Sequence, residues 1–204
     1  MRGTLIIFVK APVAGRVKTR LAQSLGPGRA AATFRRLTGL TISHASKGDW
    51  RTLIAVDPPQ AISCYAALWP RRFSRLVQAR GDLGSRMRAA FDGVAGPCVI
   101  IGSDAPALRA RHIRAAFSAL AGHDAVVGPA TDGGFWLIGL ANRRRAARLF
   151  EGVRWSSEHA LADTLASLPG AFSVARLETL RDIDEMADLQ ALGWRALHRS
   201  PARI

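Results

Sequence analysis

Short apolar runs rich in isoleucine and valine constrain the fold of this chain more than any other feature. The clearest runs cover residues 5–9, 53–56, 99–101, 125–127 and 135–140, and weaker ones cover 75–78 and 171–177. Most of these runs do not alternate apolar with polar side chains, which is typical of strands covered on both faces of a sheet. The sequence therefore predicts buried strands of a mostly parallel sheet.

Helical patterns lie between these runs. Met87, Ala90, Phe91 and Val94 follow i, i+3, i+4, i+7 spacing, as do apolar residues between 113 and 120. Longer helical patterns cover residues 30–46 and about 186–197. Strands that alternate with helices predict an α/β fold, with helices flanking the sheet. Because ligands in such folds bind beyond the carboxyl ends of the strands, motifs that directly follow a strand are the strongest site candidates.

The length and charge of the chain limit its possible domain organisation and binding partners. A length of 204 residues suits one domain, spanning 1–204. The formal net charge is +14, and every basic residue except Lys10, Lys18 and Lys47 is an arginine. The excess favours either a polyanionic partner or a compositional preference for surface arginine. The arginines are spread along the whole chain, and the densest run, 143–145 with Arg148, fits the exposed face of a short helix. We therefore do not expect nucleic acid as a partner.

Cysteine usage and apolar stretches indicate the compartment. Cys64 and Cys98 form no CxxC pair, and the lack of a disulfide framework favours a reducing environment. The run at 5–9 is too short for a signal peptide or a membrane span, and no other run approaches 18 residues. We expect a cytoplasmic protein without a membrane partner.

The loop after the first predicted strand carries three cations near a helix start. Arg16, Lys18 and Arg20 occupy alternate positions after a break at Pro12 and Gly15. Backbone amides at a helix start, together with such cations, can hold phosphate groups. Neither the Walker A spacing nor GxGxxG is present. A solvated basic helix start is the alternative, but cations there oppose the helix dipole by about 0.3–1 kcal/mol each, which favours a bound anion.

Two further motifs follow predicted strands. Gly81 and Asp82 open a segment, GDLGSRM, whose glycines permit a tight turn and close approach of a ligand. Asp82 could instead cap the following helix. Asp104 follows the apolar run at 99–101, where a carboxylate is well placed to hold Mg²⁺ or Mn²⁺ beside phosphates. The alternative for Asp104 is a turn or a cap for the helix near Arg109.

Two acidic segments complete the set of candidates. The Asp132-Gly133-Gly134 turn precedes the apolar run at 135–140, so hairpin geometry alone could explain it. Asp182 and Asp184 lie on one face of an extended segment and could supply a second carboxylate to a metal site. Asp184 could also cap the last predicted helix.

The ordered set of motifs resembles the DUF2064 family, whose members are labelled glycosyltransferases of the GT-A fold. The matching segments span nearly the whole chain and are FVKAPVAGRVKTRLA, GDLGSRM, IGSDAPAL, GPATDGGFWLIGL, VRWSSEHALADTL and RDIDEMADL. The broader group includes other nucleotide-diphospho-sugar transferases and nucleotidyltransferases. The chain departs from the family pattern in two places. Glu185-Met186-Ala187 replaces Thr-Pro-Glu, which leaves the choice between Asp182 and Asp184 open. Phe135 replaces a Tyr that is common in the family.

The resemblance implies a GT-A fold, a bound nucleotide and a divalent metal, Mg²⁺ or Mn²⁺. The nucleotide-binding residues it implies are Ala11, Pro12, Gly15, Arg16, Lys18, Arg20, Gly81, Asp82 and Arg86. The implied metal ligands are Asp104 with Asp182 or Asp184. An acceptor pocket would include Asp132, Gly133, Gly134, Trp155 and Ser156.

These residues predict a metal-dependent transferase that uses an activated nucleotide. Lys18 and Asp104 are the expected catalytic residues, acting by charge stabilisation and positioning. The transferred group is either a sugar from a nucleotide-sugar or a nucleotidyl group, and a small molecule is the expected acceptor. The competing hypothesis is a catalytically silent module that binds nucleotides or nucleic acid, for which the +14 charge predicts a steep salt dependence.

Overall fold

The computed structural model describes residues 3–141 and 148–193 and contains one seven-stranded sheet in that part of the chain. The order is β3-β2-β1-β4-β6-β5-β7, and only β6 runs antiparallel to its neighbours. The strands are β1 (Thr4–Lys10), β2 (Arg51–Asp57), β3 (Ser74–Val77), β4 (Cys98–Ile101), β5 (Ala125–Pro129), β6 (Phe135–Leu140) and β7 (Val174–Arg176). The mostly parallel sheet expected from the apolar runs is therefore confirmed.

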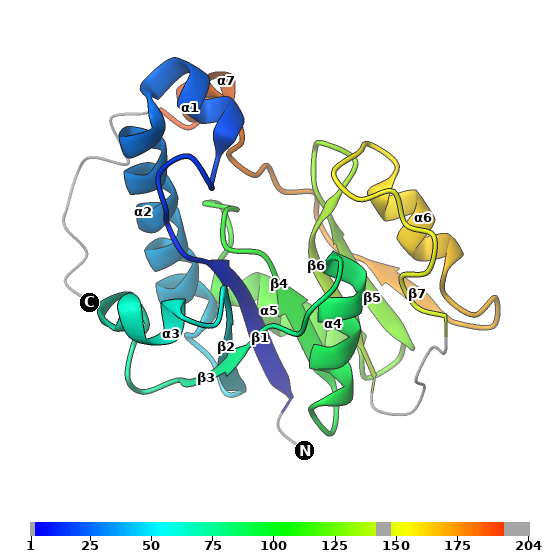
Figure 1. The fold of residues 1–204 in the computed structure, drawn as a ribbon. Helices are drawn as coiled ribbons and strands as arrows, with labels where there is room; N and C mark the ends of the chain where they lie inside the picture. Colours follow the sequence, from blue (N-terminus) through cyan, green and yellow to red (C-terminus); the bar gives the residue numbers. More distant parts are fainter. Residues whose placement is uncertain (1–2, 142–147, 194–204) are drawn as a thin grey trace.

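Helices cover both faces of the sheet, which explains why its strands are apolar without alternation (Figure 1). Leu5 and Ile7 of β1 belong to a core with α2 and α5, whereas Ile6 belongs to the opposite core with α4 and α6. The described helices are α1 (Thr19–Leu25), α2 (Pro27–Ala45), α3 (Ala61–Cys64), the 3₁₀ turn η1 (Ala66–Leu68), α4 (Leu83–Asp92), α5 (Ala110–Ala119), α6 (Ala160–Ala166) and α7 (Met186–Ala191). None of these helices is long and apolar enough to cross a membrane.

Several details differ from the sequence prediction or add to it. Only residues 130–134 separate β5 from β6, too few for a crossover, so the two strands form an antiparallel hairpin, the geometry considered for the Asp-Gly-Gly turn. The short helices α3 and α6 were not predicted, because four or seven residues carry too few apolar positions to show a period. The run 143–145 lies outside the described residues. The last predicted helix, 186–197, is helical up to Ala191, and its part from residue 194 onward lies outside the described residues.

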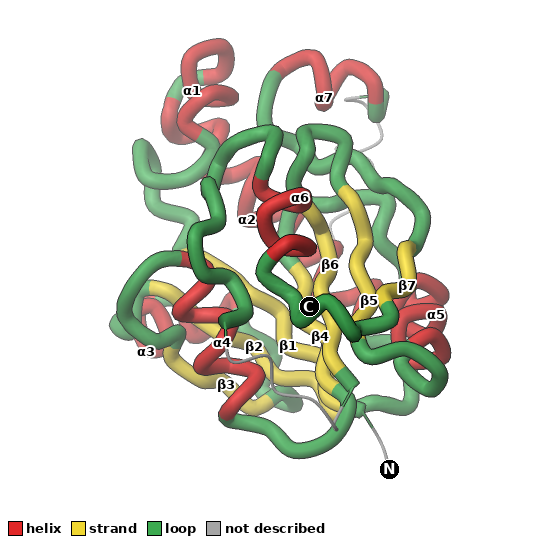
Figure 2. Tube along the Cα trace, turned by 90° about the vertical axis from the view of Figure 1, so that its right-hand side faces the viewer, coloured by secondary structure: helices red, strands yellow, loops and turns green. Residues whose placement is uncertain are grey.

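The carboxyl ends of the parallel strands meet at one edge of the sheet. Helices α1 and α7 lie beyond this edge in both views of the molecule (Figures 1 and 2). Five buried residues bind α1, α2 and α7 into a small separate core, which we call the clamp: Leu21, Ala30, Leu37, Ile183 and Leu189. The clamp joins the start of the chain to a segment near its end, and both segments flank the same edge.

We expect the clamp to contribute substantially to stability. Leu37→Ala should lower the free energy of unfolding by about 2–5 kcal/mol, because Leu37 is fully buried and truncation leaves a cavity. The matched control, Leu83→Ala, should change it by at most about 0.5 kcal/mol, because Leu83 is 42% exposed. Urea denaturation of both variants measures the difference. Similar losses in the two variants would contradict a tightly packed clamp.

Candidate functional site

The loop after β1 presents Lys18 in a constrained conformation. Gly15 has φ +80°, and Lys18 has φ 48°, a left-handed conformation that non-glycine residues rarely adopt. Val17 anchors the loop by packing against Ala31 and Phe34 of α2. Lys18 directly precedes α1, and its carbonyl accepts the amide hydrogen of Ala22. The side chain of Lys18 is only 7% exposed.

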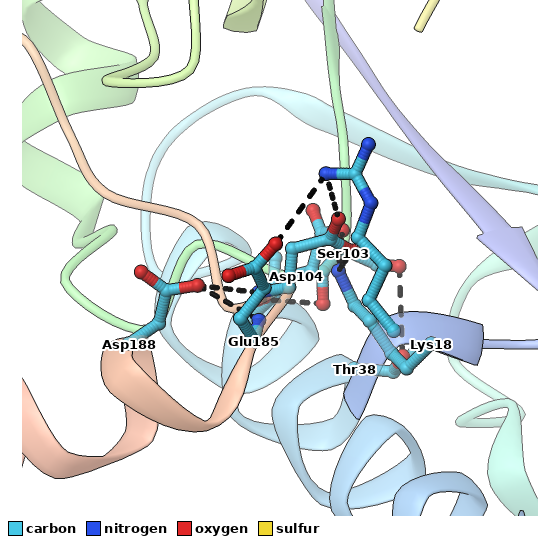
Figure 3. A network of polar contacts seen from close by, with 9 residues as sticks. Lys18, Thr38, Ser103, Asp104, Glu185 and Asp188 are labelled. Atoms are coloured by element: carbon cyan, nitrogen blue, oxygen red, sulfur yellow. Dashed lines mark hydrogen bonds and ion pairs between the residues drawn. The ribbon is translucent and has the colours of Figure 1, made fainter. Parts of the chain in front are cut away.

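An ion-pair network connects this loop to two distant parts of the chain (Figure 3). Lys18 Nζ lies 2.7 Å from Asp104 Oδ2 and 3.4 Å from Asp184 Oδ1. Arg20 Nη1 lies 3.1 Å from Asp184 Oδ2 and 3.9 Å from Glu185 Oε1. The carboxylates of Asp104 and Asp184 are 32% and 40% exposed, so both are open to solvent on one side. The network therefore combines a buried ammonium with two accessible carboxylates.

The segment that carries Asp182 and Asp184 is held across the carboxyl edge by backbone hydrogen bonds. Leu180 exchanges hydrogen bonds with Pro129 and Thr131, and the Ile183 amide donates to the carbonyl of Asp104 at 3.2 Å. The side chain of Asp188 accepts from the amides of Asp184 and Glu185 at 3.0 and 2.9 Å. These bonds leave the side chain of Asp184 available for Lys18 and Arg20.

Charge and burial shift the pKa values of two groups here. Burial alone would lower the pKa of Lys18, but the charges of Asp104, Asp184 and Asp182, and the hydrogen bond to Asp104, raise it above its ordinary value. Burial, followed by the charges of Asp104 and Asp132, raises the pKa of Asp182 to about 6. Burial is thus the main cause of the raised pKa of Asp182, and the neighbouring carboxylates add to it.

Lys18, Asp104 and Asp184 line a cleft of about 650 Å³ at the carboxyl edge. The volume lies in the range of small-molecule sites. Eight of the predicted site residues surround it: Arg16, Lys18, Asp82, Arg86, Asp104, Trp155, Ser156 and Asp184. The structure therefore brings together residues from five of the six family-like segments, while their roles remain predictions.

The start of α4 forms another part of the cleft lining. Asp82 caps this helix by accepting the Ser85 amide hydrogen at 2.8 Å, as its alternative interpretation predicted. Its other oxygen accepts from the Trp155 indole at 3.3 Å, which holds Trp155 at the cleft. Asp82 is thus both a helix cap and a lining residue. The aromatic ring of Phe135 packs edge-on against Trp155.

Two alternatives weighed for the acidic residues are wrong. Helix α5 begins at Ala110 with Arg109 as its N-cap residue, so Asp104 does not cap it. Helix α7 has Glu185 as its N-cap residue, so Asp184 does not cap that helix. Both carboxylates instead contact Lys18.

The remaining predicted residues are not among those that line the cleft. Ala11 is buried in the core, and Pro12 lines a neighbouring pocket of about 360 Å³. Arg20 contacts the cleft only through Asp184. The others that lie outside the lining, all of them in the described part of the chain, are Gly15, Gly81, Asp132, Gly133, Gly134 and Asp182.

The Asp-Gly-Gly turn has a structural basis of its own. The side chain of Asp132 accepts the Gly134 amide hydrogen at 2.9 Å. Gly133 has φ +85°, and a Cβ there would lie 2.2 Å from the carbonyl oxygen of Glu158. The turn thus packs tightly against the segment that follows Trp155 and Ser156.

Sequence reasoning missed several polar residues at or beside the cleft, among them Lys10, Gln78 and Asp57. Asp57 ends β2 and accepts from Arg86 at 3.2 Å, which orients a predicted nucleotide-binding side chain. Gln78 follows β3 and donates through Nε2 to the carbonyls of Val9 and Ala55. Each is the polar residue at the carboxyl end of a predicted strand, which is the signal that could have identified it.

The carboxylates fit a divalent cation by their chemistry. Hard oxygen ligands suit Mg²⁺ and Mn²⁺. The ammonium of Lys18 already stands between Asp104 and Asp184 as a cation. Among the described residues no group of three or more acidic, histidine or cysteine side chains is arranged around a metal position.

Solved structures share this architecture. The chain is 28% identical to a provisionally assigned nucleotide-diphospho-sugar transferase from Desulfovibrio desulfuricans G20, with a TM-score of 0.82 over 100% of this chain and 91% of that one. Rv0371c from Mycobacterium tuberculosis H37Rv, solved with manganese, is 17% identical, with a TM-score of 0.58 over 98% and 100% of the two chains. CMP:2-keto-3-deoxy-manno-octonic acid synthetase, solved with CTP, is 13% identical, with a TM-score of 0.61 over 97% and 98%.

The fold is accordingly that of the nucleotide-diphospho-sugar transferases, the GT-A fold that the motifs implied. The sequence has no match among curated proteins. The family model described as "Uncharacterized protein conserved in bacteria (DUF2064)" matches residues 41–157. Because this match covers more than half of the chain, the protein belongs to the DUF2064 family.

Proposed function

We propose that this protein is a transferase that uses an activated nucleotide and a divalent metal ion. The observation that carries the proposal is the meeting of Arg16, Lys18, Asp104 and Asp184 at one cleft on the carboxyl edge of the sheet. Cations beside accessible carboxylates suit phosphate groups that are bridged by a metal ion. The same edge is where open α/β sheets bind their ligands.

The compared proteins support this proposal. A provisionally assigned nucleotide-diphospho-sugar transferase is 28% identical to this chain over 100% of this chain and 91% of that one. A synthetase of the same fold was solved with CTP, and another relative in fold was solved with manganese. A nucleotide and a divalent cation are therefore the natural ligands to test first.

Arg16 and Lys18 are the proposed phosphate-binding residues. Both line the cleft, and Lys18 is held beneath it by the clamp and the β1–α1 loop. Once on a phosphate oxygen, the ammonium of Lys18 would stabilise the charge that develops on a leaving phosphate. Arg20, which is 62% exposed and paired with Asp184, would help to position that carboxylate.

Asp104 with Asp184 or Asp182 would hold the metal ion. When bound, Mg²⁺ or Mn²⁺ would supply charge neutralisation to the phosphate oxygens of the nucleotide. Burial is the main cause of the raised pKa of Asp182, and the charges of Asp104 and Asp132 add to it. A cation nearby would offset that part of the shift which these carboxylates cause.

The part of the cleft lined by Trp155 and Ser156 is the proposed acceptor side. Trp155 and Ser156 line the cleft, and the Asp132–Gly134 turn packs against the segment that follows them. We propose a small-molecule acceptor here, and residues 1–204 as a single GT-A-like domain, since both parts of the cleft rise from one sheet.

Loss of either central charge should slow transfer strongly without unfolding the protein. Asp104→Asn and Lys18→Ala should each lower the rate by about 10²–10³-fold, the usual cost of one charge-stabilising group. Lys47→Ala, which changes an exposed lysine outside the cleft, should keep full activity. Circular dichroism verifies folding, and steady-state kinetics measure the rate. Full activity in either site variant would refute the assignment.

Product analysis should identify the transferred group. We expect thermal stabilisation by a nucleotide with Mg²⁺ or Mn²⁺, because both ligands bind only the folded state. Release of pyrophosphate from a nucleoside triphosphate would identify nucleotidyl transfer, and release of a nucleoside diphosphate from a nucleotide-sugar would identify glycosyl transfer. Salt-sensitive retention of DNA or RNA with no turnover would instead favour a silent binding module.

Asp182→Asn should remove a pH-dependent loss of stability. Because the pKa of Asp182 is raised to about 6 in the folded protein, the wild type loses stability as the pH rises from about 4 through 6. At pH 7 without metal, the variant should be more stable by about 1–2 kcal/mol, a value reduced for solvent screening. At pH 4 the two proteins should match. Urea denaturation at both pH values tests this, and a pH-independent difference would contradict it.

A further inference from the structure

We propose that Lys18 is a built-in occupant of the metal position, and that phosphate must draw its ammonium away before a divalent cation can bind between Asp104 and Asp184. This inference concerns the regulation of the proposed active site and therefore rests on the proposed function. It predicts that the free protein binds metal poorly on its own and binds metal and phosphate together.

The first support is the geometry of the ammonium. Lys18 Nζ contacts Asp104 Oδ2 at 2.7 Å and Asp184 Oδ1 at 3.4 Å, so it bridges the two carboxylates as a bound cation would. Only 7% of the Lys18 side chain is exposed. The contact therefore differs from a surface ion pair, which solvent screens and loosens.

The second support is the backbone that delivers this ammonium. Lys18 holds φ 48°, and Val17 beside it is buried against α2. A strained residue of this kind persists only where the surroundings impose it, and such strain collects at switch regions and ligand sites. The β1–α1 loop thus aims Lys18 at the carboxylates instead of leaving it in solvent.

The ammonium of Lys18 and a metal ion would compete for the same carboxylate oxygens of Asp104 and Asp184. A metal ion that arrived alone would have to displace the ammonium and leave a nearly buried charge without a partner, which is costly. Phosphate in the cleft removes this cost, because Lys18 lines the cleft and phosphate oxygens accept its hydrogen bonds. The two ligands therefore favour each other, and this coupling must be reciprocal.

Arg20 does not impose the same restriction. Its guanidinium also contacts Asp184, at 3.1 Å, but its side chain is 62% exposed. An exposed arginine can return to water when a metal ion takes the carboxylate oxygen. Lys18 is the cation whose departure needs a new partner.

The first experiment measures Mn²⁺ alone, by electron paramagnetic resonance of free Mn²⁺, on purified protein without nucleotide. Lys18→Met should bind Mn²⁺ at least about tenfold more tightly than the wild type, a factor worth about 1.4 kcal/mol. The matched control is Lys10→Met, because Lys10 lines the same cleft but makes no ion pair with Asp104 or Asp184 among the contacts of the described chain. The control should stay within about twofold of the wild type, since it removes the same charge without freeing the carboxylates.

Equal Mn²⁺ affinity in the wild type and Lys18→Met, or an equal gain in Lys10→Met, would overturn the inference. Lys18→Gln gives a second variant in case Lys18→Met does not fold, with thermal melts as the check. The assay contains no nucleotide and no turnover. A failure of the proposed transferase activity would therefore be seen separately, in the product assays.

The second experiment follows the wild-type protein directly. The chain contains only three lysines, Lys10, Lys18 and Lys47, so their labelled side-chain signals can be assigned in NMR spectra from single variants. Inorganic pyrophosphate without metal should shift the Lys18 signal, whereas Mg²⁺ alone should leave it in place. A Lys18 signal that moves with Mg²⁺ alone, or that ignores pyrophosphate, would contradict the inference.

Discussion

The contact between Lys18 and Asp104 is the interaction on which the site depends. It exists because β1 and β4 are adjacent and parallel, so that the loops leaving them meet at one edge of the sheet. The C-terminal segment then docks on the same point, since the amide of Ile183 donates to the Asp104 carbonyl. Three segments far apart in sequence are thereby joined at one cleft, and the clamp between α1, α2 and α7 keeps them there.

Two features of the site lower the stability of the folded protein, and features of this kind point to a ligand-binding role. Lys18 adopts a left-handed conformation, and burial among carboxylates raises the pKa of Asp182 to about 6. The sheet itself is stabilised by two apolar, buried cores, one on each face. Neither the left-handed Lys18 nor the partly buried Asp182 belongs to these cores. Backbone strain and shifted pKa values of this kind are typical of functional sites.

Much of the fold was predictable from the sequence, because each strand of a buried sheet appears in the sequence as a short apolar run. All seven strands fall where those runs predict them, whereas α3 and α6 were missed because short helices leave no period. Lys18, Asp82 and Asp104 were predictable from motifs that follow strands, and Trp155 and Ser156 from the family resemblance, but the partners of these residues were not. Lys18 meets Asp184 across 166 positions of sequence, and Arg86 meets Asp57 through strand order alone. The position of Lys18 on the carboxylates, instead of in an open phosphate loop, required the three-dimensional structure.

The most direct test of this account is a crystal structure of the protein with a nucleoside triphosphate and Mn²⁺, with the metal located by its anomalous scattering. The account predicts a manganese peak coordinated by Asp104 and by Asp184 or Asp182, with the ammonium of Lys18 on a phosphate oxygen and out of contact with Asp104. A structure in which the nucleotide and manganese are bound while Lys18 still bridges Asp104 and Asp184 would contradict it.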